Sequence, residues 1–149
     1  MGWRIASAAV VVAVAVAVAL SPAPVPAPVP SGAATPDHVL HTLPDWMPAG
    51  GITLGRHVFL KASQQTGYGI GHELVHVRQQ AAHPAWFWVS YLLRPGWRLR
   101  WEAEAYAVQA RARCPIDGEH GLAAYLSGPA YLWPGSQAQA AAAIRTYLE

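Results

Sequence analysis

The chain has 149 residues and a formal net charge of +2, with a single cysteine, Cys114, and a single lysine, Lys61. This length suits one domain and leaves no room for a second catalytic domain. One cysteine excludes an intramolecular disulfide, and the small charge gives no reason to expect a nucleic-acid partner. The fold must therefore be stabilised by its hydrophobic core, with a metal ion as a further candidate.

The first 36 residues differ in composition from the rest of the chain. Residues 1–20 carry Arg4 and then an apolar run, an order typical of a secretory signal peptide, with a membrane anchor as the alternative. Residues 21–36 are rich in proline and alanine and predict an extended linker. We therefore expect residues 37–149 to form the domain of a secreted or extracytoplasmic protein, either free or membrane-anchored.

The first part of this domain predicts irregular structure, then strand, then helix. Residues 35–51 contain several prolines and glycines and predict irregular structure. Residues 52–62 contain two β-prone runs broken by a Gly-Arg pair, which predicts either a short hairpin or a bulged strand. A helix is expected from Gln64 to about Ala82, where Pro84 ends it. Three glycines in its first turns either fray the helix or allow close packing.

Residues 85–97 are unusually dense in aromatic side chains and end in Pro-Gly. They predict a cover helix or loop that packs against the preceding helix. The alternative is an apolar substrate wall or a membrane-interface contact, for which Trp86 to Trp101 supplies tryptophans and arginines. The composition alone does not choose between these roles.

The remaining residues predict three helices. Helix formers without glycine or proline predict a second long helix over residues 99–113. Residues 118–126 and 137–148 predict two short helices, and Ser136 is a suitable N-cap for the last. The fold class expected from these elements is α+β and mostly helical, with a short strand or hairpin ahead of the helices.

The run His72-Glu73-Leu74-Val75-His76 is the most informative motif of the chain. Residues four apart lie on one face of a helix, so both imidazoles can turn toward one metal ion with Glu73 beside them. In such sites a glutamate activates metal-bound water as a general base. The motif therefore predicts a catalytic zinc site with His72 and His76 as ligands and Glu73 as the base. The alternative is a solvated helix that carries two unrelated histidines.

A catalytic zinc site usually takes three protein ligands, so the chain must supply a third. The arrangement HExxHxxGxxH is absent, because His83 has the wrong spacing. The acidic residues between His76 and Cys114 are Glu102 and Glu104. On a helix these two side chains point about 200° apart, so at most one of them reaches the metal.

Three segments carry a resemblance to known families: Gly51 to Leu60, His72 to Gln80, and Trp101 to Tyr106. In this order they are similar to the minigluzincins, which are small gluzincin-type zinc metallopeptidases, and to the uncharacterised core domain family of injection systems. The resemblance implies a zincin-like domain, Zn²⁺ as cofactor and Glu102 as the third ligand, with the other glutamate as the alternative. Tyr106 stands where many relatives have an aspartate that supports the active-site helix.

These features lead to two functional hypotheses. The first is a zinc metallopeptidase in which Glu73 takes a proton from zinc-bound water, while an edge strand near Gly55–Leu60 aligns an extended peptide. The second is a non-proteolytic, zinc-stabilised module that binds peptides or has a structural role in secretion. The expected partner is a peptide or protein, and a membrane contact through the N-terminal segment or Trp86 to Trp101 is compatible with both.

Hydrolysis of a peptide bond also calls for a donor that stabilises the negative charge on the attacked carbonyl oxygen. Tyrosine and histidine side chains can serve. Tyr106, His120, Tyr125 and Tyr131 are the candidates, and no spacing rule chooses among them.

Overall fold

The computed structural model describes residues 37–112, 118–132 and 134–149. The predicted signal peptide or anchor over residues 1–20 and the predicted linker over residues 21–36 lie outside the described residues, as does Cys114. Within the described part, a small sheet is followed by helices. The predicted α+β, mostly helical class is therefore confirmed.

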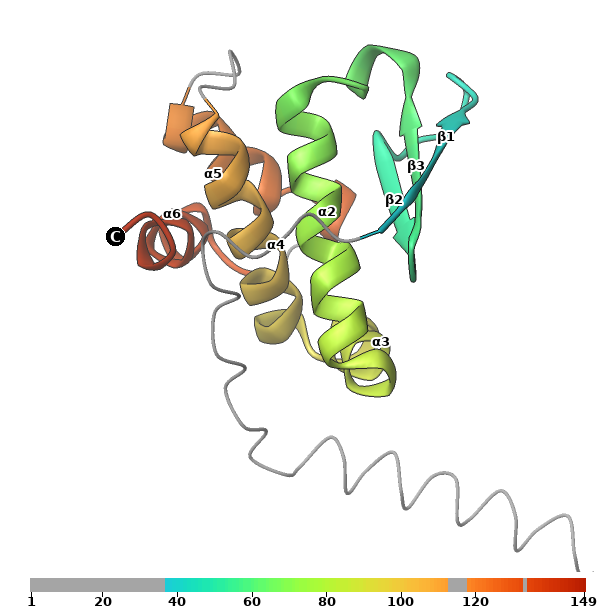
Figure 1. Ribbon diagram of the computed structural model, residues 1–149. Coiled ribbons are helices and arrows are strands. Elements are labelled where there is room, and N and C mark those ends of the chain that lie inside the picture. The colour runs from blue at the N-terminus through green and yellow to red at the C-terminus, as the bar shows by residue number, and fades with distance from the viewer. Residues whose placement is uncertain (1–36, 113–117, 133) are drawn as a thin grey trace, which may run out of the picture.

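The elements follow one another without internal repetition, and 3₁₀ helices are marked η. In chain order they are β1 (Val39–Leu43), β2 (Gly51–Leu54), β3 (His57–Lys61), η1 (Ala62–Gln64), α2 (Gly67–Ala82), α3 (Pro84–Leu93), α4 (Pro95–Arg111), α5 (Gly118–Leu126), η2 (Pro129–Tyr131) and α6 (Gln137–Thr146). Figure 1 shows the sheet on one side of α2, α4, α5 and α6 on the opposite side, and α3 at one end of α2. The helix that carries the HExxH motif thus lies between the sheet and the helical core.

The sheet has the strand order β1-β3-β2, with β1 parallel and β2 antiparallel to β3. Of the two alternatives for residues 52–62 the hairpin is correct, and Gly55 in its turn has a φ of +59°, which glycine adopts without steric cost. The prediction of irregular structure over residues 35–51 is wrong for Val39–Leu43. These residues form a strand because they pair with β3, a parallel partner that lies far along the chain and leaves no local signal.

The HExxH helix begins later than predicted. Gln64, the predicted first residue, is instead the last residue of η1. Helix α2 starts at Gly67, after the N-cap residue Thr66. The Thr66 hydroxyl accepts a hydrogen bond from the Gly69 N–H. A Cβ at Gly69 would collide with the carbonyl oxygen of Gln64. Close packing is therefore the reason for glycine at this position.

Prolines mark both helix junctions that follow. Pro84 is the first residue of α3, and Pro95 is the first residue of α4. A proline is tolerated there because the first N–H groups of a helix have no intrahelical partner. The aromatic segment is thus a cover helix rather than a loop, and α4 begins at Pro95 instead of the predicted Leu99.

Helix α4 is the centre of the helical core, because every residue from Trp101 to Ala107 is buried. One side of α4 packs against α5 and α6 and the other against α2. The small side chains let the helix axes approach closely. The cluster between α4, α5 and α6 contains Ala103, Tyr106, Ala107, Leu122, Ala123, Leu126, Ala140, Ala141 and Ile144.

The two C-terminal helices agree with the sequence prediction. Helix α5 has the predicted bounds, and α6 ends at Thr146, two residues before the predicted Leu148. Ser136 caps α6 through a capping box with Gln139, in which each side chain bonds the other residue's backbone N–H. These helices close the side of the core that faces away from the sheet.

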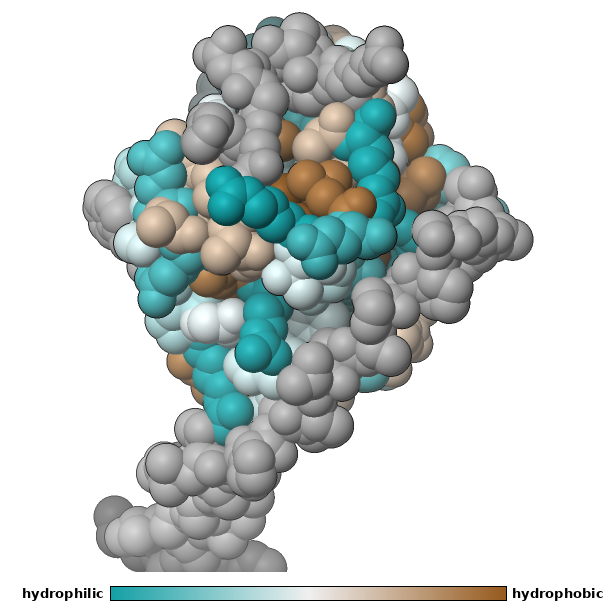
Figure 2. Space-filling view, turned by 90° about the vertical axis from the view of Figure 1, so that its left-hand side faces the viewer, coloured by the Kyte–Doolittle hydropathy of each residue, from teal (hydrophilic) through white to brown (hydrophobic). Residues whose placement is uncertain are grey.

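The surface is mixed in character. Figure 2 turns the α5 and α6 side toward the reader and shows hydrophilic residues interspersed with smaller hydrophobic groups. Elsewhere, Leu92 and Leu93 at the end of α3 are 63% and 58% exposed. Among the described residues, no helix is both long enough and apolar enough to cross a membrane.

A matched pair of substitutions tests the role of Gly69. We expect Gly69→Ala to lower the free energy of unfolding by about 1–3 kcal/mol, because the added Cβ meets the Gln64 carbonyl. Gly67→Ala, in the same helix but with open space around the added methyl, should raise it by about 0.4–1 kcal/mol. Urea unfolding measures both, and equal stabilisation by the two variants would contradict the packing argument.

Candidate metal centre

Helix α2 presents both motif histidines to the helical core. His72 and His76 are one turn apart and both are buried. Their Nε2 atoms lie 3.3 Å from each other. Two ligands of one tetrahedral zinc, each 2.0–2.1 Å from the ion, are about 3.3–3.4 Å apart. The pair is therefore spaced as two ligands of one ion are.

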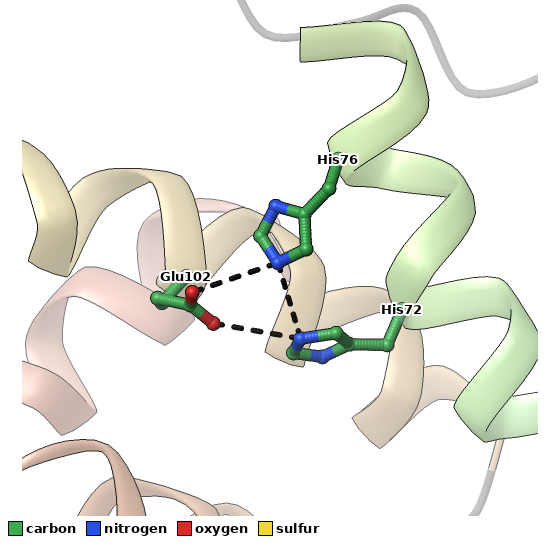
Figure 3. Close-up of side chains that lie close together, drawn as sticks. All are labelled: His72, His76 and Glu102. Carbon is green, nitrogen blue, oxygen red and sulfur yellow. Dashed lines mark hydrogen bonds and ion pairs between the residues drawn. The ribbon is translucent and has the colours of Figure 1, made fainter. Parts of the chain in front are cut away.

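Glu102 completes the group from α4, the helix that packs against α2. Its Oε2 lies 3.4 Å from His72 Nε2 and its Oε1 lies 3.6 Å from His76 Nε2. Figure 3 shows the three side chains turned toward one another across the α2–α4 interface. Within the described residues, His72, His76 and Glu102 form the group that can hold a metal ion. The structure thus brings together the three predicted ligand residues.

One buried oxygen of this group is placed to bind an ion between the side chains. Glu102 Oε2 is buried and has no hydrogen-bond partner among the described residues. His72 Nε2 lies 3.4 Å from this oxygen as an ion-pair partner but not as a hydrogen-bond donor, and coordination of a cation would supply the missing bond. The donor set of two imidazoles and one carboxylate is one that zinc accepts.

The electrostatics of the group also favour a cation. Burial alone would lower the pKa of His76 and raise that of Glu102, but their mutual attraction reverses both effects. The Glu102 carboxylate raises the pKa of His76 to about 9, and the two histidines hold the pKa of Glu102 well below its usual value. Glu102 therefore stays ionised, which is the form that binds a metal, whereas His76 has to release a proton before it can bind one.

A chain of hydrogen bonds orients His76. Its Nδ1 lies 2.8 Å from Gln79 Oε1, and Gln79 Nε2 in turn donates to Glu104 Oε2 and to the Trp101 carbonyl. With Nδ1–H donating to Gln79, Nε2 faces Glu102, and its lone pair becomes available to a metal once the Nε2 proton is released. Glu104 is thus directed at Gln79 and not at the group of three. The two glutamates do point to different neighbours, as their spacing predicts.

Tyr91 supports Glu102 and was missed by the sequence analysis. Its hydroxyl, on α3, donates to Glu102 Oε1 at 2.6 Å. Burial and, second, the charge of Glu102 raise the pKa of Tyr91, so the phenol keeps its proton and remains a donor. One carboxylate oxygen is therefore held by Tyr91, which leaves Oε2 for an ion. The aromatic density of residues 85–97 was a signal, but it did not indicate which ring reaches the site.

Tyr106 fills the position at which the resemblance expects an aspartate. Its ring packs edge-on against the His72 ring, with 4.6 Å between centroids, and its hydroxyl pairs with that of Tyr131 at 2.7 Å. His72 Nδ1 has no hydrogen-bond partner among the described residues. His72 is therefore held by packing, whereas His76 is held by a hydrogen bond.

Glu73 is held between α2 and the sheet. The Thr53 hydroxyl on β2 donates to Glu73 Oε2 at 2.6 Å, and a Cβ at Gly51 would collide with the other carboxylate oxygen. Thr53 therefore fixes the orientation of this carboxylate, and glycine at position 51 gives it room. Gln80 adds a second connection between α2 and the hairpin. Its side chain donates a hydrogen bond to the Thr53 carbonyl and accepts one from the Gly55 N–H.

All four motif and ligand residues line one cleft of about 860 Å³. Its walls come from β2, α2, α3, α4, α5 and η2, and they are largely apolar. The aromatic and aliphatic lining residues include Ile52, Phe87, Trp88, Tyr91, Tyr106, Leu122, Tyr125 and Tyr131. The surface around the group of three is therefore mostly apolar.

The segment that the sequence analysis took for an edge strand is not at an edge of the sheet. Gly55–Leu60 falls on the hairpin turn and on β3, which is the central strand with a partner on each side. The free edge next to the cleft belongs to β2, whose residues Gly51 to Thr53 line it. The earlier assignment is wrong because the parallel strand β1 covers the other edge of β3 and was not foreseen.

Three of the four candidate donors for oxyanion stabilisation, Tyr106, Tyr125 and Tyr131, line the cleft. Burial first and the charge of Glu102 second raise the pKa values of Tyr106 and Tyr131, so both remain protonated. The side chain of His120 lies outside the described residues.

Comparison with known families finds one match. The eCIS core domain model matches residues 36–84. The chain is thus similar, over about a third of its length, to this injection-system domain, and the matched part holds the sheet and α2 with its HExxH motif. It ends before Tyr91 and Glu102. No curated protein matches the chain, and no solved structure does.

Paired substitutions of the two glutamates test the ligand set. Glu102→Gln should reduce bound metal to background, because a neutral amide replaces the ionised ligand. Glu104→Gln should keep about one metal per chain, since its partner is Gln79. Elemental analysis of the purified variants and the wild type measures this, and metal loss from the Glu104 variant alone would reverse the assignment.

Tyr91→Phe isolates the hydroxyl that holds Glu102. We expect metal affinity to fall by about 10- to 100-fold, as for other groups that orient a ligand, while the folded structure is kept. Tyr125→Phe is the control, because Tyr125 lies on α5 and packs against Tyr106 and Tyr131. Titration with a competing chelator gives both affinities, and equal values for the two variants would show that the Tyr91 hydroxyl does not support the site.

Proposed function

We propose that the chain is a zinc-dependent peptidase of the gluzincin type. The observation that carries this proposal is the group His72, His76 and Glu102, which opens onto a large cleft with Glu73 beside it. Three protein ligands facing a cleft leave a position for water, whereas a structural zinc site is closed by four. The arrangement therefore favours catalysis over a purely structural ion.

Glu73 is the proposed general base. A zinc ion held by the three ligands would supply a bound water of lowered pKa. Glu73 would take a proton from that water at its carboxylate and later pass it to the leaving amine. Thr53 keeps one oxygen of this carboxylate in place, so the base is oriented before substrate binds. Tyr91 keeps Glu102 in place in the same way.

The cleft suggests the kind of peptide that binds. No lysine or arginine is among its described lining residues, so it offers no cation to a C-terminal carboxylate. We expect cleavage at internal bonds, with large apolar side chains next to the bond because the walls are aromatic and aliphatic. The edge of β2 would pair with the extended backbone of the peptide.

A second function is favoured by the match to the eCIS core domain. On this hypothesis the chain is a non-proteolytic module of a secretion or injection system, in which zinc stabilises the fold and the cleft binds a peptide. The two hypotheses share the metal ligands and differ in the role of Glu73. A secreted or extracytoplasmic location would suit both, and it rests on the sequence of residues 1–20 alone.

Glu73→Gln separates the two functions. We expect this variant to bind zinc as the wild type does but to lose hydrolysis of an apolar fluorogenic peptide by at least about 100-fold, because the amide cannot accept the proton. Zinc content measured on the same sample shows that the site is intact. Equal hydrolysis by variant and wild type would refute the peptidase, and zinc-loaded wild type without activity on a peptide library would favour the module.

A further inference from the structure

Helix α3 is apolar on all sides and yet is only partly covered. Its sequence, Pro-Ala-Trp-Phe-Trp-Val-Ser-Tyr-Leu-Leu, has no charged residue, and of its ten residues only Phe87 and Ser90 are buried. A helix of this composition is normally buried. The inner side of α3 supplies Phe87, Trp88 and Tyr91 to the cleft, so the question concerns its outer side and its C-terminal end.

The exposed end carries two adjacent leucines in a fixed conformation. Leu92 and Leu93 are more than half exposed. The buried guanidinium of Arg98 donates to the carbonyl oxygens of Tyr91 and Leu92 and so holds the last turn of α3. These leucines are therefore presented by a rigid turn, not by a mobile loop.

Tryptophans and arginines surround the leucines. The rings of Trp86 and Trp97 meet edge-on at 5.9 Å between centroids. The guanidinium of Arg94 lies 5.3 Å from the Trp86 ring centroid, and that of Arg100 lies 5.3 Å from that of Trp97. Indole rings next to cations are typical of groups that sit at the interface between lipid headgroups and acyl chains.

The segment that forms this end carries a net positive charge. The sequence contains no aspartate or glutamate between Glu73 and Glu102, and both of these glutamates are buried in the metal centre. Arg100 is exposed, so this segment presents positive charge at the surface. An anionic surface complements such a site.

We propose that the α3–α4 corner, defined as Trp86, Leu92, Leu93, Arg94, Trp97 and Arg100, docks on an anionic lipid bilayer. The leucines enter the headgroup–acyl boundary, the indoles lie at headgroup level, and the arginines contact lipid phosphates. The corner lies at the lower end of α2 in Figure 1, beside the α3 wall of the cleft. Docking would hold the cleft close to the membrane surface, and it is independent of the peptidase proposal.

The test is a depth measurement at single positions of the full chain. In a Cys114→Ser background, Leu92→Cys carries an environment-sensitive fluorophore, and Trp46→Cys, in the turn after β1, carries it in the control. Both native side chains are exposed, at 63% and 80%. Vesicles of phosphatidylcholine with phosphatidylglycerol, with and without brominated acyl chains, report whether each fluorophore enters the bilayer, whatever residues 1–36 do.

We expect blue-shifted emission and bromine quenching for the probe at position 92 and neither for the probe at position 46. Arg94→Gln and Arg100→Gln should each lower the ratio of docked to undocked protein roughly fivefold. On vesicles of phosphatidylcholine alone, little of the protein should dock. Equal quenching at the two positions would overturn the proposal. So would a probe at position 92 that stays solvent-exposed on anionic vesicles, or one already shielded without lipid, because a protein segment would then cover the corner.

Discussion

The burial of Glu102 between two helices is the constraint on which the rest of the structure depends. A buried carboxylate is costly unless its charge is compensated, and here the compensation comes from His72 and His76 on the facing helix. This requires α2 and α4 to pack at a fixed separation. On its other side α4 packs against α5 and α6, and alanines lie in that contact.

The site is held by three different parts of the chain. Gln79 on α2 orients His76, Tyr91 on α3 holds Glu102, and Thr53 on β2 holds Glu73. Each of these bonds occupies one polar atom of the side chain that it orients. The second polar atom, which is Nε2 of His76, Oε2 of Glu102 or Oε1 of Glu73, is left for the metal or the cleft. The small sheet therefore does more than cover α2, because it fixes the carboxylate proposed as the base.

The sequence predicted those parts of the site that depend on local periodicity. Four-residue spacing places His72 and His76 on one face, and the 200° between the two glutamates separates Glu102 from Glu104 as the structure does. Residues whose role depends on distant contacts were not predictable in this way. Val39–Leu43 becomes a strand only because β3 is beside it, and Tyr91 is distinguished from its aromatic neighbours only by its hydrogen bond to Glu102.

The eCIS core match covers only one part of the candidate metal centre. The matched segment contains the HExxH motif and the β2 residues that hold Glu73, but it lacks Glu102 and Tyr91. Two histidines alone do not make a catalytic zinc site, so the segment by itself holds the scaffold and the proposed base without three candidate ligands. In this chain α4 supplies the third residue of the group that can hold a metal ion. A set of three candidate ligands therefore depends on residues beyond the match, whereas the proposed base lies within it.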